Sequence, residues 1–205
     1  LTPEEVESAI KDGELKYPVI SKSRWGMGSK GVTFLNNKEE MFLFYNLYKG
    51  KFSAPGFLAA EMERKEETLV FQEVIDGIEY GLDIVNDLQG KWYTTAIKKK
   101  LMMRGGETDI AEVVNNSEIK EVSQKISMVL KHKGNVDCDI LTCKTGTFVI
   151  DINPRFGGGY MFSLAAGMDV PYLLKRWAEG EALSGISIRT GCVYRKITEL
   201  KELSI

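Results

Sequence analysis

Two short runs of alternating apolar and polar residues, joined by a tight turn, constrain the fold of this chain more than any other feature. They span residues 135–142 and 147–152, and the turn between them reads Lys144-Thr145-Gly146. A period of two residues is typical of strands that bury one face, and a short connection with glycine joins such strands into an antiparallel hairpin. The sequence therefore predicts an antiparallel sheet in the second half of the chain.

Acidic side chains recur along both strands of this predicted hairpin. Asp137 and Asp139 lie in the first strand, and Asp151 and Asn153 end the second. Side chains two residues apart share a face, so each pair points one way. If both pairs face one cleft, carboxylates about 4 Å apart repel by about 4 kcal/mol at an effective dielectric of about 20. Such a group requires a cation or a proton, and an all-oxygen set suits Mg²⁺ or Mn²⁺ with nucleotide phosphates in the remaining positions.

The segment that leaves the hairpin carries a further cation and a glycine triplet. Arg155 follows Asn153 by two residues, and its planar donors suit a γ-phosphate or an acyl phosphate. Residues 157–159 are all glycine, which permits a close approach of the backbone at the start of the next helix. The alternative interpretation is a solvated hairpin with scattered acids.

A glycine-rich loop occupies residues 26–31 and reads Gly-Met-Gly-Ser-Lys-Gly. A dinucleotide-binding loop would be followed by a helix, whereas residues 32–35 look like a strand. The Gly-Lys-Ser or Gly-Lys-Thr sequence of a P-loop and the catalytic motifs of protein kinases are also missing. Backbone N–H groups of such a loop, with Lys22, Arg24 and Lys30 beside it, can still hold phosphates. An ordinary hairpin with a long glycine turn is the alternative.

The remaining pattern mixes strands and helices without regular alternation, which indicates an α+β fold. Glu73-Val74-Ile75 ends one predicted strand, and Glu79 begins the next. A strand end offers backbone groups to an adenine, and a glutamate offers an acceptor to a ribose, although a simple hairpin with surface acids explains the same residues. Strands are predicted at 17–22, 32–35, 69–75, 79–86, 92–99 and 190–196, and helices at 37–48, 117–131 and 168–177.

Composition excludes several classes of protein. The 205 residues suit one domain or one domain of two lobes, and the net charge of −2 is unlike the basic footprint of a nucleic-acid binder. No apolar run approaches the ~20 residues that span a membrane, and no signal peptide is visible. The three cysteines show no zinc spacing and indicate buried thiols of a reducing cytoplasm. The chain begins with Leu1, so we expect an excised piece of a longer protein.

Taken in order, these segments resemble the ATP-grasp superfamily, and within it the ATP-grasp domain of the carbamoyl-phosphate synthase large subunit. The matching stretches are residues 18–31, 72–79 and 137–159, and the most specific is Asp151-Ile-Asn-Pro-Arg-Phe-Gly-Gly-Gly159. The resemblance implies an α+β fold in which two lobes with antiparallel sheets grip ATP. The smaller lobe would span roughly 17–75 and the larger roughly 76–205, and we expect the lobe that precedes this core in the family to be absent from this sequence.

The resemblance also implies a role for each matched residue. Arg155, Lys22 and Asn153 would serve catalysis, with Lys22 on the α- and β-phosphates and Arg155 on the transferred phosphoryl group. The metal ligands would be Asp137, Asp151 and Asn153. The remaining nucleotide contacts would come from Gly26, Gly28, Ser29 and Gly31 in the loop, Glu73, Val74 and Ile75 at the adenine, and Glu79 at the ribose.

The family's chemistry predicts an ATP- and magnesium-dependent carbon–nitrogen ligase. A carboxylate or bicarbonate would be phosphorylated and then attacked by an amine or ammonia, and a homodimer is compatible with the pattern. Asp151 stands where the family usually has glutamate, and Lys22 stands where true carbamoyl-phosphate synthases have arginine. A stand-alone ligase of amino acids or peptides and a non-catalytic nucleotide-binding domain remain alternatives. We expect weak or no turnover from this piece alone.

Overall fold

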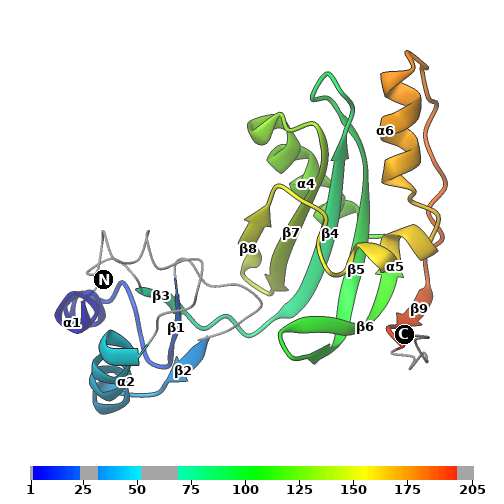
Figure 1. The fold of residues 1–205 in the computed structure, drawn as a ribbon. Helices are drawn as coiled ribbons and strands as arrows, with labels where there is room; N and C mark the ends of the chain where they lie inside the picture. The colour runs from blue at the N-terminus through cyan, green and yellow to red at the C-terminus, as the bar shows by residue number, and fades with distance from the viewer. Residues whose placement is uncertain (1, 24–31, 52–68, 198–205) are drawn as a thin grey trace, which may run out of the picture. The chain divides into compact units, whose positions relative to one another are not determined.

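The computed structural model describes residues 2–23, 32–51 and 69–197, except for the side chains of residues 49–51. It divides into two compact units, Leu1–Ile75 and Asp76–Ile205. Both contain helices and antiparallel strands, so the predicted α+β class is confirmed (Figure 1). The predicted glycine-rich loop at 26–31 lies outside the described residues.

The first unit packs two helices against a small antiparallel sheet. Thr2 begins the first helix with a capping box, because its hydroxyl accepts from the Glu5 amide and the Glu5 carboxylate accepts from the Thr2 amide. Val6, Val19 and Met41 are fully buried in the core between helices and sheet. The elements are α1 (Pro3–Lys11), β1 (Val19–Ser23), β2 (Thr33–Leu35), α2 (Lys38–Lys51) and β3 (Leu69–Glu73), in strand order β2-β1-β3.

The second unit is built on a six-stranded antiparallel sheet in the order β8-β7-β4-β5-β6-β9. Short turns join β4, β5 and β6 into a meander and β7 and β8 into a hairpin, whereas α4 connects β6 to β7, which pairs with β4. The elements are β4 (Ile78–Asn86), β5 (Trp92–Arg104), β6 (Glu107–Val114), α4 (Ser117–Leu130), β7 (Gly134–Cys143), β8 (Gly146–Asn153), α5 (Tyr160–Ala165), α6 (Val170–Ala178) and β9 (Cys192–Arg195).

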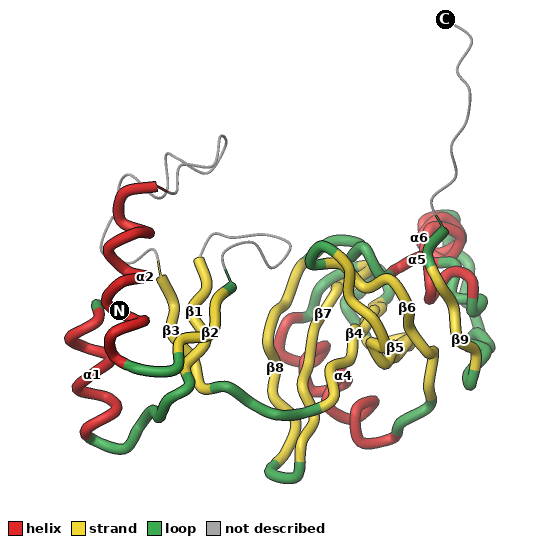
Figure 2. Tube along the Cα trace, turned by 90° about the horizontal axis from the view of Figure 1, so that it is seen from below, coloured by secondary structure: helices red, strands yellow, loops and turns green. Residues whose placement is uncertain are grey.

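One face of this sheet is apolar and covered by α4 (Figure 2). Asn116 caps the helix by accepting from the Ile119 amide, and Ile119 is buried against the sheet. Leu82, Ile84 and Ile140 project from the strands into the same cluster, and none of the three is exposed. Because alternate residues of a strand point to opposite faces, the odd-numbered residues of β4 lie on the other side.

The opposite face is apolar over only part of its area. Val85 and Ala96 pack there against Tyr160, Met168 and the residues around α6. Farther across the sheet, Ala111 and Val113 on β6 pack against Phe162 and Ala166 at α5. The short helices α5 and α6 therefore cover one part of this face, and the rest carries charged residues.

Several expectations from the sequence need correction. Residues 107–114 form β6, which the alternation analysis did not predict, and β5 continues to Arg104 instead of ending near residue 99. None of the three cysteines forms a disulfide, but only Cys138 is buried, whereas Cys143 and Cys192 are partly exposed. None of the helices within the described residues is long and apolar enough to cross a membrane.

Candidate active site

The hairpin of β7 and β8 brings four oxygen-bearing side chains to one face. Asp137 pairs directly with Asn153, and Asp139 pairs directly with Asp151. Directly opposite residues of an antiparallel pair share a face, and residues two apart along each strand share it too. The register shifts between Asp139 and Ile140, so the bulge falls just beyond the second pair. The strand pairing thus has the geometry that the alternation predicted.

These side chains are linked to one another and to two cations. The Asn153 amide donates to Asp151 at 2.9 Å, and Arg155 Nη1 lies 3.5 Å from Asp137 Oδ2. On the other side, Lys100 Nζ is 2.9 Å from Asp139 Oδ1 and 2.6 Å from Glu79 Oε1. Burial lowers the pKa of the Lys100 ammonium, but Asp139 and Glu79 outweigh this effect and the pKa is raised.

Asp137, Asp139, Asp151 and Asn153 form an acidic row, whose negative charge is incompletely balanced at Asp137. Burial raises the pKa of this carboxyl group to about 6; Asp139 and Asp83 raise it further, whereas Lys98 and Arg155 oppose the shift. Within the described residues, no three His, Cys, Asp or Glu side chains converge into a preformed metal cage. The row therefore has oxygen donors and excess negative charge, but its carboxylates are not yet gathered around one point.

A buried polar network continues the row onto β4 and β5. Asp83 pairs directly with Asp137 in the sheet and is fully buried. Its carboxylate accepts from Lys98 Nζ, from the Ser163 hydroxyl and, at 3.1 Å, from Asn135 Nδ2. A buried carboxylate is stable only with such partners, so the network also ties α5 to the sheet.

The glycine triplet lies directly over these charged residues. A Cβ atom on Gly157 would overlap the carboxyl group of Asp137, and one on Gly159 would lie 3.6 Å from Lys98 Nζ. A side chain at position 157 is therefore incompatible with the observed position of Asp137. The triplet permits the backbone that follows Arg155 to pack onto the acidic row.

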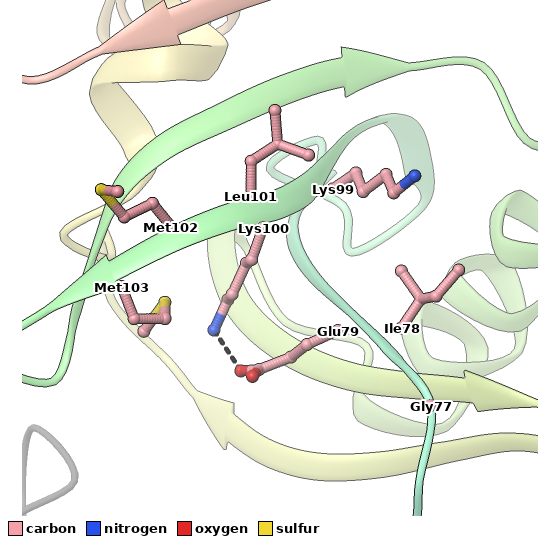
Figure 3. Close-up of a pocket in the computed structure, with 8 residues that line it drawn as sticks. All are labelled: Gly77, Ile78, Glu79, Lys99, Lys100, Leu101, Met102 and Met103. Atoms are coloured by element: carbon pink, nitrogen blue, oxygen red, sulfur yellow. Dashed lines mark hydrogen bonds and ion pairs between the residues drawn. The ribbon is translucent and has the colours of Figure 1, made fainter.

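An open pocket of about 420 Å³ lies beside the Lys100–Glu79 pair. Figure 3 shows Lys100 reaching toward Glu79, with Met102 and Met103 following along β5. The walls combine one ion pair with apolar, polarisable side chains, a composition that suits a flat aromatic ring. The lining residues are Gly77, Ile78, Glu79, Lys99, Lys100, Leu101, Met102 and Met103.

The predicted site residues fall into three groups. Asp137, Asp151, Asn153 and Arg155 are brought together, and Glu79 lies on the same face of the second unit. Lys22 is in β1, Glu73 ends β3, and Val74 and Ile75 follow it, all in the first unit. Gly26, Gly28, Ser29 and Gly31 lie outside the described residues.

Sequence reasoning overlooked the role of the basic run on β5. In the sequence the run Lys98-Lys99-Lys100 resembles a solvated strand end, but Lys98 is only 2% exposed and Lys100 is held between two carboxylates. Asp139, which was recognised as an acid of the hairpin but not chosen as a ligand, lies directly opposite Asp151. The two-residue spacing of Lys98 and Lys100 was the signal available in the sequence, because it places both side chains on the same face of the strand.

Comparison with known proteins agrees with this architecture. The model of the family described as "ATP-grasp in the biosynthetic pathway with Ter operon" matches residues 65–200, which is more than half of the chain. The chain belongs to this ATP-grasp family. The predicted ATP-grasp membership and fold are thereby confirmed, whereas the narrower likeness to carbamoyl-phosphate synthase remains a prediction. No match was found among curated proteins.

Solved structures of carboxylases and a synthetase share the fold. Biotin carboxylase from Campylobacter jejuni, in complex with β,γ-ATP, has a TM-score of 0.69 at 19% identity, covering 90% of this chain and 42% of that one. The biotin carboxylase domain of Hydrogenobacter thermophilus 2-oxoglutarate carboxylase, with MgADP, ADP and bicarbonate, has a TM-score of 0.67 at 18% identity. That match covers 92% of this chain and 43% of the other. Staphylococcus aureus N5-carboxyaminoimidazole synthetase with ADP has a TM-score of 0.65 at 16% identity, covering 91% of this chain and 47% of the other. This chain spans less than half the length of each.

Proposed function

We propose that this ATP-grasp chain is the nucleotide-binding core of an ATP- and magnesium-dependent ligase. The activity would convert a carboxylate, or bicarbonate, into an acyl phosphate that an amine or ammonia then attacks. The observation that carries the proposal is the row of Asp137, Asp139, Asp151 and Asn153 on one sheet face, with Arg155 at its end. Nucleotides in the similar carboxylase and synthetase structures support ATP as the ligand.

The donor set of the row fits Mg²⁺. All four side chains offer oxygen, and Mg²⁺ in nucleotide sites takes one or two carboxylates while phosphates and water complete its shell. A preformed cage of three carboxylates is therefore not required. The raised pKa of Asp137 marks a place where added positive charge would be stabilising. When bound, the ion would neutralise charge on the β- and γ-phosphates.

The pocket beside Glu79 is where we place the nucleoside. Ile78, Met102 and Met103 supply apolar surface for a base, and Glu79 supplies the acceptor for ribose hydroxyls. Glu79 accepts from Lys100 Nζ, so ribose binding would share or replace that contact. In the first unit, Lys22 with residues 26–31 and the segment Glu73–Ile75 keep the phosphate and adenine roles that the resemblance assigns.

Arg155 is the group we assign to the transferred phosphoryl. Its side chain is 57% exposed, and its Nη1 lies 3.5 Å from Asp137 Oδ2 and donates to the Phe156 carbonyl at 3.1 Å, which leaves the other guanidinium N–H groups for a ligand. In the first step a carboxylate oxygen forms a bond to the γ-phosphorus and ADP leaves; in the second an amine displaces inorganic phosphate and gives an amide. A guanidinium that stabilises the charge shared among phosphoryl oxygens lowers the barrier to both steps.

A hydroxylamine trap tests the proposal on the full-length protein. With ATP, Mg²⁺ and a panel of carboxylic acids, we expect ADP formation that depends on the acid, together with the corresponding hydroxamate. Arg155→Met should lower kcat about 100-fold or more while leaving nucleotide affinity nearly unchanged. Bicarbonate with ammonia is assayed by phosphate release. Nucleotide binding without acid-dependent ADP formation for any member of the panel, or for bicarbonate, would contradict a ligase.

A further inference from the structure

A second charged group lies on the edge of the sheet formed by β6 and β9, outside the row described above. Asp109 on β6 is only 2% exposed, and both of its carboxylate oxygens are shielded from solvent. Arg104 Nη2 lies 2.9 Å from its Oδ1, and Arg195 Nε lies 3.5 Å from its Oδ2. A buried carboxylate without a cation would be costly, so Asp109 holds both guanidinium groups at the same place.

The two arginines are bound at one end and exposed at the other. Their side chains are 62% and 64% exposed, and neither contact to Asp109 has the geometry of a good hydrogen bond. Each guanidinium carries five N–H donors in a planar fork, and within the described residues Asp109 is the acidic partner of both. Most of their donors therefore remain available. Two guanidinium groups fixed by one buried carboxylate form a binding place for an anion.

This edge lies next to the candidate active site. Lys196, which follows Arg195, pairs with Glu107 at 3.0 Å. A Cβ atom on Gly158 would lie 3.4 Å from Glu107 Oε2 and 3.7 Å from Lys196 Nζ, whereas one on the preceding Gly157 would meet Asp137. Consecutive Cα atoms are about 3.8 Å apart. One short stretch of backbone thus separates the acidic row from the cationic edge.

We propose that Arg104 and Arg195 bind a second anionic group, a carboxylate or a phosphate, on the acid that the enzyme activates. This inference rests on the proposed ligase function, since it assumes that the reacting carboxylate lies near Arg155. Three cations, Arg104, Arg195 and Lys196, face two carboxylates here, so the edge keeps an excess positive charge. The substrate class is a carboxylic acid with a remote anionic group, and the two arginines determine that specificity.

Matched acids of equal length test the inference without turnover. Calorimetry on the nucleotide-loaded protein compares succinate, 3-phosphonopropionate and butyrate, and then the homologues with one and two more methylene groups. We expect at least one dianionic acid to bind about 10-fold or more tightly than its monoanionic partner, as one charge-assisted bidentate contact predicts. Whichever of the dicarboxylate and the phosphonate binds more tightly identifies the remote anionic group.

Substitutions of Arg104 and Arg195 test whether these two residues cause the preference for a dianionic acid. Arg104→Gln and Arg195→Gln should each reduce the preference for the dianion at least 5-fold without changing the affinity of the monoanion, and Arg104→Lys should restore part of it. Arg176→Gln on α6 is the control and should retain it. No preference at any length, or a preference that survives in both glutamine variants, overturns the inference. Nucleotide affinity, measured first, reports separately on the proposed function.

Discussion

The two faces of the six-stranded sheet use the same strands for different purposes. On the face under α4, Leu82, Ile84 and Ile140 form a closed apolar cluster. On the other face, the residues next to them in sequence include Asp83 and Asp139, which take part in ion pairs and in the acidic row. One face thus supplies the stability that permits the other to concentrate charge. The difference also indicates which substitutions should affect folding and which should affect binding.

The largest effect on folding should come from removing Lys98. It is 2% exposed and balances the fully buried Asp83, so Lys98→Ala leaves an uncompensated buried charge. We expect a loss of about 3–5 kcal/mol in the free energy of unfolding, measured by denaturant titration. Lys99→Ala, one residue along the same strand, is the matched control. An unchanged midpoint for Lys98→Ala would mean that the pair does not stabilise the charged face.

Truncating a side chain on the apolar face should lower the free energy of unfolding without changing nucleotide affinity. Leu82→Ala deletes a fully buried side chain and should cost about 2–5 kcal/mol, with Val129→Ala, on the exposed side of α4, as control. Because Leu82 points away from the acidic row, nucleotide affinity should be unchanged at temperatures where the variant remains folded. A large loss of affinity in the folded variant would contradict the separation of the two faces.

The glycine triplet offers a local perturbation of the charged face. In Gly157→Ala the new methyl group displaces the Asp137 carboxylate, so we expect about 1–3 kcal/mol of destabilisation and weaker binding of magnesium nucleotide. Gly185→Ala is the control, because a Cβ there meets no atom within 4 Å. Equal behaviour of the two variants in thermal unfolding and in calorimetry would exclude the close contact.

Neutralising Asp137 should increase stability. Its pKa in the folded protein is about 6, above the ordinary value of 3.8, so ionisation opposes folding and stability falls as pH rises from about 4 to about 6. Without metal, Asp137→Asn should gain roughly 1–2 kcal/mol at pH 7.5, and the gain should disappear below about pH 4. Denaturation curves across this range provide the measurement. A loss of stability at pH 7.5 would show that the carboxylate is already well compensated.

The smallest effect concerns the single histidine, at the end of α4. Burial lowers the pKa of His132, although its Nε2 contact with the Ile84 carbonyl at 3.0 Å raises it in part. Protonation therefore favours the unfolded chain, and stability should decrease as pH falls below about 6.5 through the lowered pKa, by less than about 1 kcal/mol at pH 6. NMR titration of its one imidazole signal gives the pKa directly. A value above 6.5 would reverse the predicted sign.

Strand parity accounts for what the sequence predicted well. The two-residue spacings of Asp137 with Asp139 and of Asp151 with Asn153 were sufficient to place each pair on one face, and the observed strand register brings both pairs to the same face. The same argument was not applied to β5, whose long polar end resembles a solvated strand. The sequence does not reveal β6 because Gly105-Gly106, the two-residue turn that precedes it, resembles a loop.

Other features depend on tertiary contacts that a sequence pattern does not reveal. The Asp83 network joins β4, β5, β7 and α5, whose residues are up to 80 positions apart. Asp109 and its arginines come from three strands, of which only β5 and β9 had been anticipated. Periodicity reports which face a residue occupies, but it does not report which distant residue shares that face.

Calorimetric titration with magnesium and a non-hydrolysable ATP analogue tests the central claim most directly. The doubly substituted Asp151→Ala/Asn153→Ala protein is compared with wild type and with Glu121→Ala, which removes an exposed carboxylate from α4. The account predicts binding by wild type and Glu121→Ala that strengthens with Mg²⁺, and a loss of at least 10-fold in that magnesium-dependent affinity for the double variant. Equal magnesium-dependent affinity in all three proteins would contradict the assignment of the acidic row as the metal–nucleotide site.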